Sequence, residues 1–185
     1  MKNTYYRTLI ILTILTTLMG ATSSHAETAG PGKINLGGEI GWTNLLSGGN
    51  VSSLGYGLRL GYGITSNIEL GLSGLMFSIN SSSIFGSTSI GYTFLMVDAL
   101  YRPEGMSQLY VGPMLGLGFI STSGSAVGGI STSGTSGANL SIGGTVGYDL
   151  SVTPQLKIGP KFNYLNNTIM NVSAFQANAA IKYQF

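Results

Sequence analysis

Apolar and polar residues alternate along eight segments of this chain, and every charged residue within those segments lies on the polar side of the alternation. A period of two is the side-chain period of a β-strand with two unlike faces. The eight predicted strands are 33–43, 54–64, 68–79, 89–102, 108–120, 138–150, 156–165 and 175–185. The alternation therefore predicts an all-β fold with one continuous apolar face.

The charged residues decide which face meets water. The predicted strands contain ten of them: Lys33, Glu39, Arg59, Glu69, Asp98, Arg102, Asp149, Lys157, Lys161 and Lys182. Two architectures fit this pattern, a soluble lipocalin-like barrel and a membrane barrel with its apolar face outside. The polar face is mostly Gly, Ser and Asn, too sparsely charged for a good solvated surface, whereas a lipid-facing Arg or Lys near the midplane costs about 2–4 kcal/mol. We therefore predict an eight-stranded antiparallel up-and-down transmembrane β-barrel.

The connections between the predicted strands alternate in length. The turns 65–67, 103–107 and 151–155 are short. The other four are mostly longer and rich in Ser, Gly and Asn: 47–53, 80–88, 121–137 and 166–171. Short periplasmic turns and longer outward loops are typical of outer-membrane barrels, so both termini are expected on the periplasmic side. Because lipid cannot hydrogen-bond an open sheet edge, the last strand is expected to pair with the first.

The first 26 residues have the composition of a secretory signal peptide. Lys2 and Arg7 precede an apolar stretch, 9–19, and Ser24-His25-Ala26 forms a small-x-small cleavage site. The apolar stretch is shorter than the roughly 20 residues that span a bilayer. Cleavage would leave a barrel domain, 27–185, which is formally neutral and lacks His and Cys. Without a basic stripe, nucleic-acid binding is not expected.

Two stretches resemble small bacterial outer-membrane barrels: "YVGPMLGLGF" at 110–119 and the terminal "IKYQF". The resemblance is to the transmembrane domain of OmpA, the OmpX/Ail group and the opacity-like proteins. It implies outer-membrane lipids and the outer-membrane assembly machinery as partners. In such families a terminal Phe with alternating apolar residues is the assembly signal, a role that the resemblance implies for Ile181, Tyr183 and Phe185.

Four charged residues are candidates for an ion-pair network in the bore. If the first loop centres near Gly49, Glu39 lies opposite Arg59 on the next strand, and Asp98 and Lys161 join them. Charges in a confined space must be paired, so a structural role is expected first. A gated leak of small ions through the network is the alternative.

A second inward group is apolar and lies toward the long-loop half of the strands. It consists of Phe77, Phe94, Met96, Met114 and Ile120. We expect a dry plug of the upper barrel. The alternative is a small pocket for hydrophobic solutes, by resemblance to OmpW-like barrels.

The third long loop contains a near repeat, "ISTSGSAVGG" followed by "ISTSGTSG" over 120–137. It has no charge and no aromatic ring, and its Gly/Ser content predicts a flexible linker.

Catalysis is not expected. The processed chain lacks the imidazole of a Ser-His-acid hydrolase, a Cys nucleophile and any His/Cys metal cluster, and its acids lie on different strands. No cofactor or metal is therefore predicted. The favoured hypothesis is a non-catalytic structural or surface-interaction protein of the cell envelope, and the alternative is a narrow channel or binding site for small solutes.

Overall fold

The computed structural model describes residues 30–46, 51–83, 86–126, 131–169 and 171–185. Its strands are β1 (Ile34–Leu45), β2 (Val51–Gly63), β3 (Ile68–Ser83), β4 (Gly86–Tyr101), β5 (Leu109–Ala126), β6 (Ser131–Thr135), β7 (Asn139–Tyr148), β8 (Leu150–Ser151), β9 (Leu156–Asn167) and β10 (Val172–Gln184). Within these residues no helix is long and apolar enough to cross a membrane. The predicted signal peptide, 1–26, lies outside the described residues.

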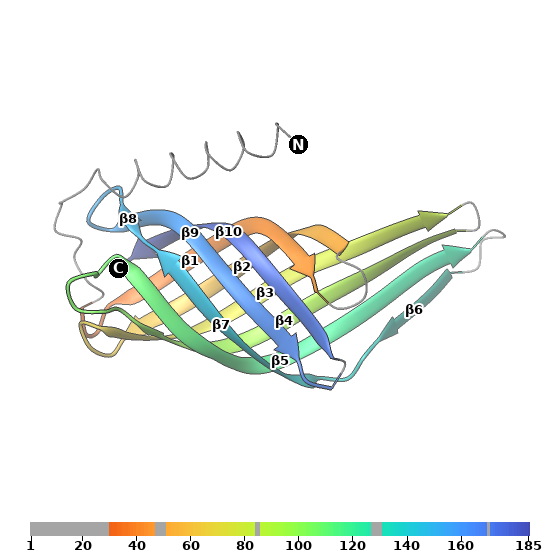
Figure 1. Cartoon of the computed structure of the whole chain (residues 1–185), viewed down its shortest axis with the longest axis horizontal. Helices are drawn as coiled ribbons and strands as arrows, with labels where there is room; N and C mark the ends of the chain where they lie inside the picture. Colours follow the sequence, from red (N-terminus) through yellow and green to blue (C-terminus); the bar gives the residue numbers. More distant parts are fainter. Residues whose placement is uncertain (1–29, 47–50, 84–85, 127–130, 170) are drawn as a thin grey trace, which may run out of the picture.

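The strands form a closed antiparallel ring (Figure 1). Pairing runs from β1 to β5 in chain order, then through β7 and β9 to β10, while β6 pairs with β5 off this path and β8 pairs with β9. β10 pairs with β1 from Gln184 opposite Asn35 to Ala174 opposite Leu45. The N–H of Phe185 extends this seam by donating to the carbonyl oxygen of Ile34 at 2.9 Å. The predicted eight-stranded barrel and its closure by the last strand are confirmed.

The two faces of the ring differ as the alternation predicts. Nine of the ten charged strand residues are buried inside the ring, and Lys33 is half-buried at its end. The outward face is apolar, and Leu58 is 70% exposed and Trp42 60% exposed. Such exposure would be costly in water, whereas hydrocarbon accepts it. The inverted arrangement, with the polar side in and the apolar side out, is that of a membrane barrel.

The short turns are held by local hydrogen bonds at one end of the ring. The hydroxyl oxygen of Thr65 accepts from the N–H of Ile68 at 3.0 Å, and that of Thr153 accepts from the N–H of Leu156 at 2.9 Å. The turn after β4 places Gly105 at a φ of +81°, a left-handed conformation that glycine adopts without strain. These tight connections fix the register of the hairpins that they join.

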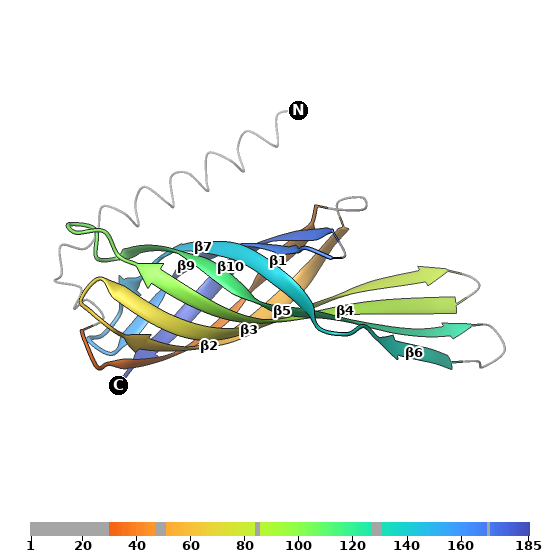
Figure 2. The ribbon, with the colours of Figure 1, turned by 90° about the horizontal axis from the view of Figure 1, so that it is seen from below.

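Two hairpins project beyond the opposite end of the ring, as Figure 2 shows from below. One consists of the ends of β3 and β4, which remain paired as far as Ser83 opposite Gly86. The other consists of the end of β5 and β6, paired from Ser121 opposite Thr135 to Ser125 opposite Ser131. Because β4 also pairs with β5 along this part, the four segments make one sheet that continues the barrel wall. We call it the protruding sheet: residues 78–83, 86–92, 121–126 and 131–135.

The protruding sheet corrects two predictions: that 80–88 and 121–137 are loops, and that the second of them is a flexible linker. Except for residues 84–85 and 127–130, which lie outside the described part, most of these positions belong to strands. The sequence did not predict strands in these segments because Ser, Thr and Gly lie on both of their faces, so there is no alternation of apolar and polar residues to detect. Backbone pairing continues from the barrel strands nonetheless, because each strand extends the ladder of its neighbour.

Candidate functional site

The bore contains an ion-pair group centred on Arg59 of β2. Its Nη2 lies 2.5 Å from Oδ1 of Asp98 on β4, and its Nε lies 3.1 Å from both oxygens of that carboxylate. Arg59 also pairs with Glu69 of β3. The hydroxyl of Ser73 donates to Asp98 at 2.7 Å. Three neighbouring strands are thus joined by charge-assisted hydrogen bonds inside the barrel.

A second group surrounds Glu39 of β1. Nζ of Lys161 on β9 lies 3.0 Å from one carboxylate oxygen of Glu39, and the amide groups of Asn163 and Asn178 donate to the other at 3.2 and 2.8 Å. Gln176 extends this group by accepting from the amide of Asn163 at 3.2 Å. Every partner of Glu39 in this group comes from β9 or β10, across the closing seam.

The predicted opposition of Glu39 and Arg59 is wrong. Glu39 lies opposite Gly57, and Arg59 lies opposite Gly37, because the first loop is centred one residue earlier than expected. The register therefore shifts by two residues, which preserves the face of every side chain. All four predicted network residues still point inward, but they form two groups rather than one.

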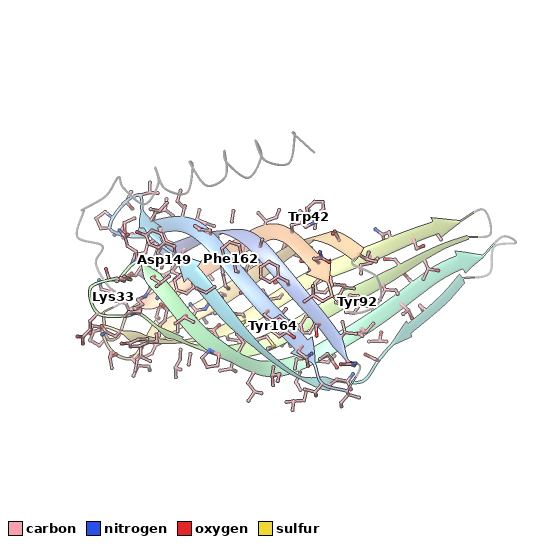
Figure 3. All side chains as sticks on the ribbon, viewed as in Figure 1. Lys33, Trp42, Tyr92, Asp149, Phe162 and Tyr164 are labelled. Carbon is pink, nitrogen blue, oxygen red and sulfur yellow. The ribbon has the colours of Figure 1, made fainter. Side chains whose placement is uncertain are left out.

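A third polar group lies at the short-turn end, where Figure 3 labels Asp149. Oδ2 of Asp149 lies 2.7 Å from Nη2 of Arg102 and 3.0 Å from Nζ of Lys182. Both cations also lie over the ring of Tyr110, at 5.2 and 4.8 Å from its centre. The alternation predicts that Arg102, Asp149 and Lys182 point inward, but it does not indicate that they meet. Sequence reasoning did not single out Tyr110, whose ring is 2% exposed and lies under both cations.

Between these polar groups is a cavity of about 20 Å³, lined in part by Glu39, Arg59, Tyr110, Asp149 and Lys182. That volume has room for about one water molecule. The interior of an eight-stranded barrel is just wide enough for side chains to fill, and here they fill it around this cavity.

The predicted apolar residues lie together toward the protruding sheet. Phe77, Phe94 and Met114 are each 2% exposed, Met96 is fully buried, and the half-buried Ile120 packs against them. The ring of Phe77 stacks on those of Tyr92 and Phe94, with centres 4.8 and 6.1 Å apart. The remaining buried members are Leu45, Leu75, Tyr92, Leu165 and Ala174. Since they come from β1, β3, β4, β5, β9 and β10, the group, which we call the apolar plug, crosses the bore.

The three predicted assembly residues line the outer surface of β10 and the chain end. Ile181, Tyr183 and Phe185 are 51%, 41% and 69% exposed. The rings of Tyr183 and Phe185 meet edge to face with centres 4.9 Å apart. In the described residues, no group of three His, Cys, Asp or Glu side chains is placed to hold a metal ion.

The protruding sheet is the other candidate site, and within the described residues no further strand pairs with either of its edges. β2 pairs with β3 only as far as Gly55 opposite Phe77, so the described ladder leaves the outer edge of 79–83 unpaired by β2. On the other side, β6 is the last strand of the sheet. Such edges present unpaired N–H and C=O groups, which are templates for adding a further strand.

Comparison with solved structures finds the same barrel fold in several proteins. Ail, the attachment invasion locus protein of Yersinia pestis, solved with the heparin analogue sucrose octasulfate, is 15% identical, with a TM-score of 0.65 over 84% of this chain and 99% of Ail. Neisserial surface protein A is 16% identical, with a TM-score of 0.56 over 83% of this chain and 99% of that protein. The N-terminal barrel of Pseudomonas aeruginosa OprF is 15% identical, with a TM-score of 0.51 over 84% and 99%.

No curated protein sequence matches the chain. The model of one family, described as the outer membrane protein beta-barrel domain, matches residues 13–185. The apolar outer wall, the closed ring and this match all indicate that the chain lies in the bacterial outer membrane, in contact with its lipids. The chain belongs to the outer membrane protein beta-barrel domain family.

Proposed function

We propose that this chain is a non-catalytic outer-membrane protein whose barrel is a closed scaffold and whose protruding sheet is its interaction surface. The short turns and both termini face the periplasm in this proposal, so that the sheet extends outward from the cell. The observation that carries the proposal is the continuation of β3, β4 and β5 beyond the ring, with β6 added at the edge.

The packing of the bore supports a scaffold rather than a channel. The ion pairs tie β2 to β3 and β4, and β1 to β9, so they brace the wall from inside. Above them, Tyr92 is the only member of the apolar plug with a polar side-chain group, so a passing ion would find little there to replace its water, and leaving water for such a region is costly. The charged residues therefore serve a structural role in this proposal.

The protruding sheet suits binding by strand addition, in which main-chain hydrogen bonds hold an added polypeptide strand at a free edge. Its composition argues against a sulfated ligand such as the heparin analogue bound to Ail. Residues 70–97 and 110–148 contain no Lys or Arg, which are the usual partners of anionic groups. Main-chain pairing needs no such side chains.

Two measurements test the proposal. Planar bilayers containing the full chain should show no current above bare lipid, whereas a steady single-channel current would favour the channel. In the second, residues 121–135 are replaced by a short turn, which keeps Ile120 and Ser136 at the base of the hairpin, and cells are assayed for attachment to serum-coated surfaces. We expect the barrel to fold and attachment to fall, and unchanged attachment would contradict the role of the sheet.

We further propose that cleavage follows Ala26 and that the assembly machinery recognises Ile181, Tyr183 and Phe185. Mass spectrometry of the membrane-extracted protein would give the new N-terminus, which is expected at Glu27. Deletion of Phe185 should lower the amount inserted in cells while leaving refolding into lipid vesicles nearly unchanged. Equal losses in both systems would mean that Phe185 acts through stability alone.

A further inference from the structure

The near repeat of the third loop pairs with itself. Residues 120–124 and 130–134 both read "ISTSG". In the hairpin they run antiparallel, with Thr122 opposite Gly134, Ser123 opposite Ser133 and Gly124 opposite Thr132. One strand of this sequence is therefore already seen to accept a second strand of the same sequence.

β6 offers its other edge for the same kind of pairing. The N–H of Ser136 donates to the carbonyl oxygen of Ile120 at 2.8 Å, which makes this a hydrogen-bonded pair. Since hydrogen-bonded and non-hydrogen-bonded pairs alternate along an antiparallel ladder, the main-chain groups of Ser131, Ser133 and Thr135 point away from β5. No charged residue and no Pro occurs in 120–138 to block that edge.

We propose that β6 pairs antiparallel with β6 of a second copy of this chain, with Ser133 opposite the same residue of the second copy. This proposal rests on the proposed function and adds a second copy of the chain as one partner of the sheet. The register follows from the hairpin. Residues 122–124 of β5 have the same sequence as residues 132–134 of β6, so residues 132–134 of a second copy can pair with the other edge of β6 in the register that 122–124 use within the chain. Thr132 then lies opposite Gly134, as Thr122 does in the hairpin.

The antiparallel direction determines where the two barrels lie. In Figure 2 the protruding sheet points away from the ring along its length. Two sheets joined edge to edge with antiparallel strands are related by a two-fold axis perpendicular to the sheet, so their barrels lie at opposite ends. The two copies therefore span two facing membranes, and a parallel pairing would be needed for neighbours in one membrane. Each edge is short, so many copies acting together would hold two surfaces.

Cross-linking tests this register, because the chain contains no Cys. Vesicles carrying the Ser133→Cys variant with one tag are mixed with vesicles carrying it with another tag, under mild oxidation. We expect disulfide-linked dimers that contain both tags. Thr135→Cys is the matched control, because in this register each copy of residue 135 faces residue 131 and not its own equivalent. Dimers formed only within one vesicle population, or equally by both variants, would overturn the proposal.

Two proline substitutions, one at each edge of the protruding sheet, test which edge adds the second copy. Ser133→Pro removes an N–H that points away from β5, so the hairpin is retained while strand addition is blocked. Asn80→Pro does the same on the β3 edge: the N–H of Arg102 donates to the carbonyl oxygen of Asn67 at 2.8 Å, so the even residues of β3 point away from β4. We expect Ser133→Pro to abolish vesicle aggregation in light scattering and Asn80→Pro to leave it unchanged.

The two proposals fail separately. Two results would overturn self-pairing and leave the proposed function standing. One is that Asn80→Pro alone abolishes vesicle aggregation. The other is that wild-type vesicles do not aggregate while cells still attach to serum-coated surfaces. A current through the wild-type protein, or attachment unaffected by replacing 121–135, would overturn the proposed function itself. Heat-modifiable migration in gels verifies that each variant has folded.

Discussion

Replacing Arg59 by Met tests whether the bore is as dry as the packing indicates. Arg59 and its two acidic partners are buried. The change removes the partner that holds Asp98 at 2.5 Å and also pairs with Glu69. Asp98 would keep only the hydroxyl of Ser73 from this group, and Glu69 would keep Arg102, whose Nη2 is 3.7 Å away.

Breaking a buried ion pair by removing one partner costs about 3–5 kcal/mol, because it leaves an uncompensated buried charge. We expect Arg59→Met to lower the free energy of unfolding by about this amount. Adding Asp98→Asn should recover part of the loss, since it neutralises one of the two stranded carboxylates. Contacting residues typically show coupling of about 0.5–3 kcal/mol in such cycles.

The assay is urea unfolding in lipid vesicles, followed by the fluorescence of Trp42, the single tryptophan of the chain, which lies on the lipid-facing wall. Linear extrapolation gives the free energy of unfolding. Leu58→Met, on the lipid-facing side next to Arg59, is the control and should change it little. A loss for Arg59→Met below about 1 kcal/mol, the value of solvent-exposed pairs, would refute the argument by showing that water reaches these carboxylates.

Three further predictions concern the lipid-facing wall, the apolar plug and the close approach of neighbouring strands. Leu58→Arg places a charge in hydrocarbon and should cost about 2–4 kcal/mol in the same assay; no loss would mean that this face is not in lipid. Met114→Lys should lower the folded fraction in gel-shift measurements, because it buries a charge in the apolar plug, and an unchanged folded fraction with lost solute uptake would instead indicate a binding pocket. Gly159→Ala brings a Cβ to 1.6 Å from the carbonyl oxygen of Tyr148 and should impair refolding, whereas at Gly74 the nearest atom is 3.7 Å away and Ala should be tolerated.

The position of each side chain inside or outside the ring was predictable from the sequence. The period of two and the charges on one parity are local features of each strand, and they need no knowledge of which strand pairs with which. For the same reason the inward position of Phe77 and Met114 followed from their parity alone. The physical cause is strong, because a charge on the wrong face would meet hydrocarbon.

Partners across the bore were not predictable in this way. Glu39 meets Lys161 and not Arg59, because pairing depends on register and on the curvature of the closed ring, neither of which leaves a mark on one strand. The meeting of Arg102, Asp149 and Lys182 at the short-turn end is likewise a consequence of closure.

The sequence by itself determined that this chain closes a lipid-facing ring, because every strand separately records the solvent on each of its sides. Only the tertiary structure decided that the Ser- and Gly-rich connections continue as a paired sheet beyond the ring. Main-chain hydrogen bonds hold that sheet together, and they are available to any residue except Pro, so side-chain composition does not predict them.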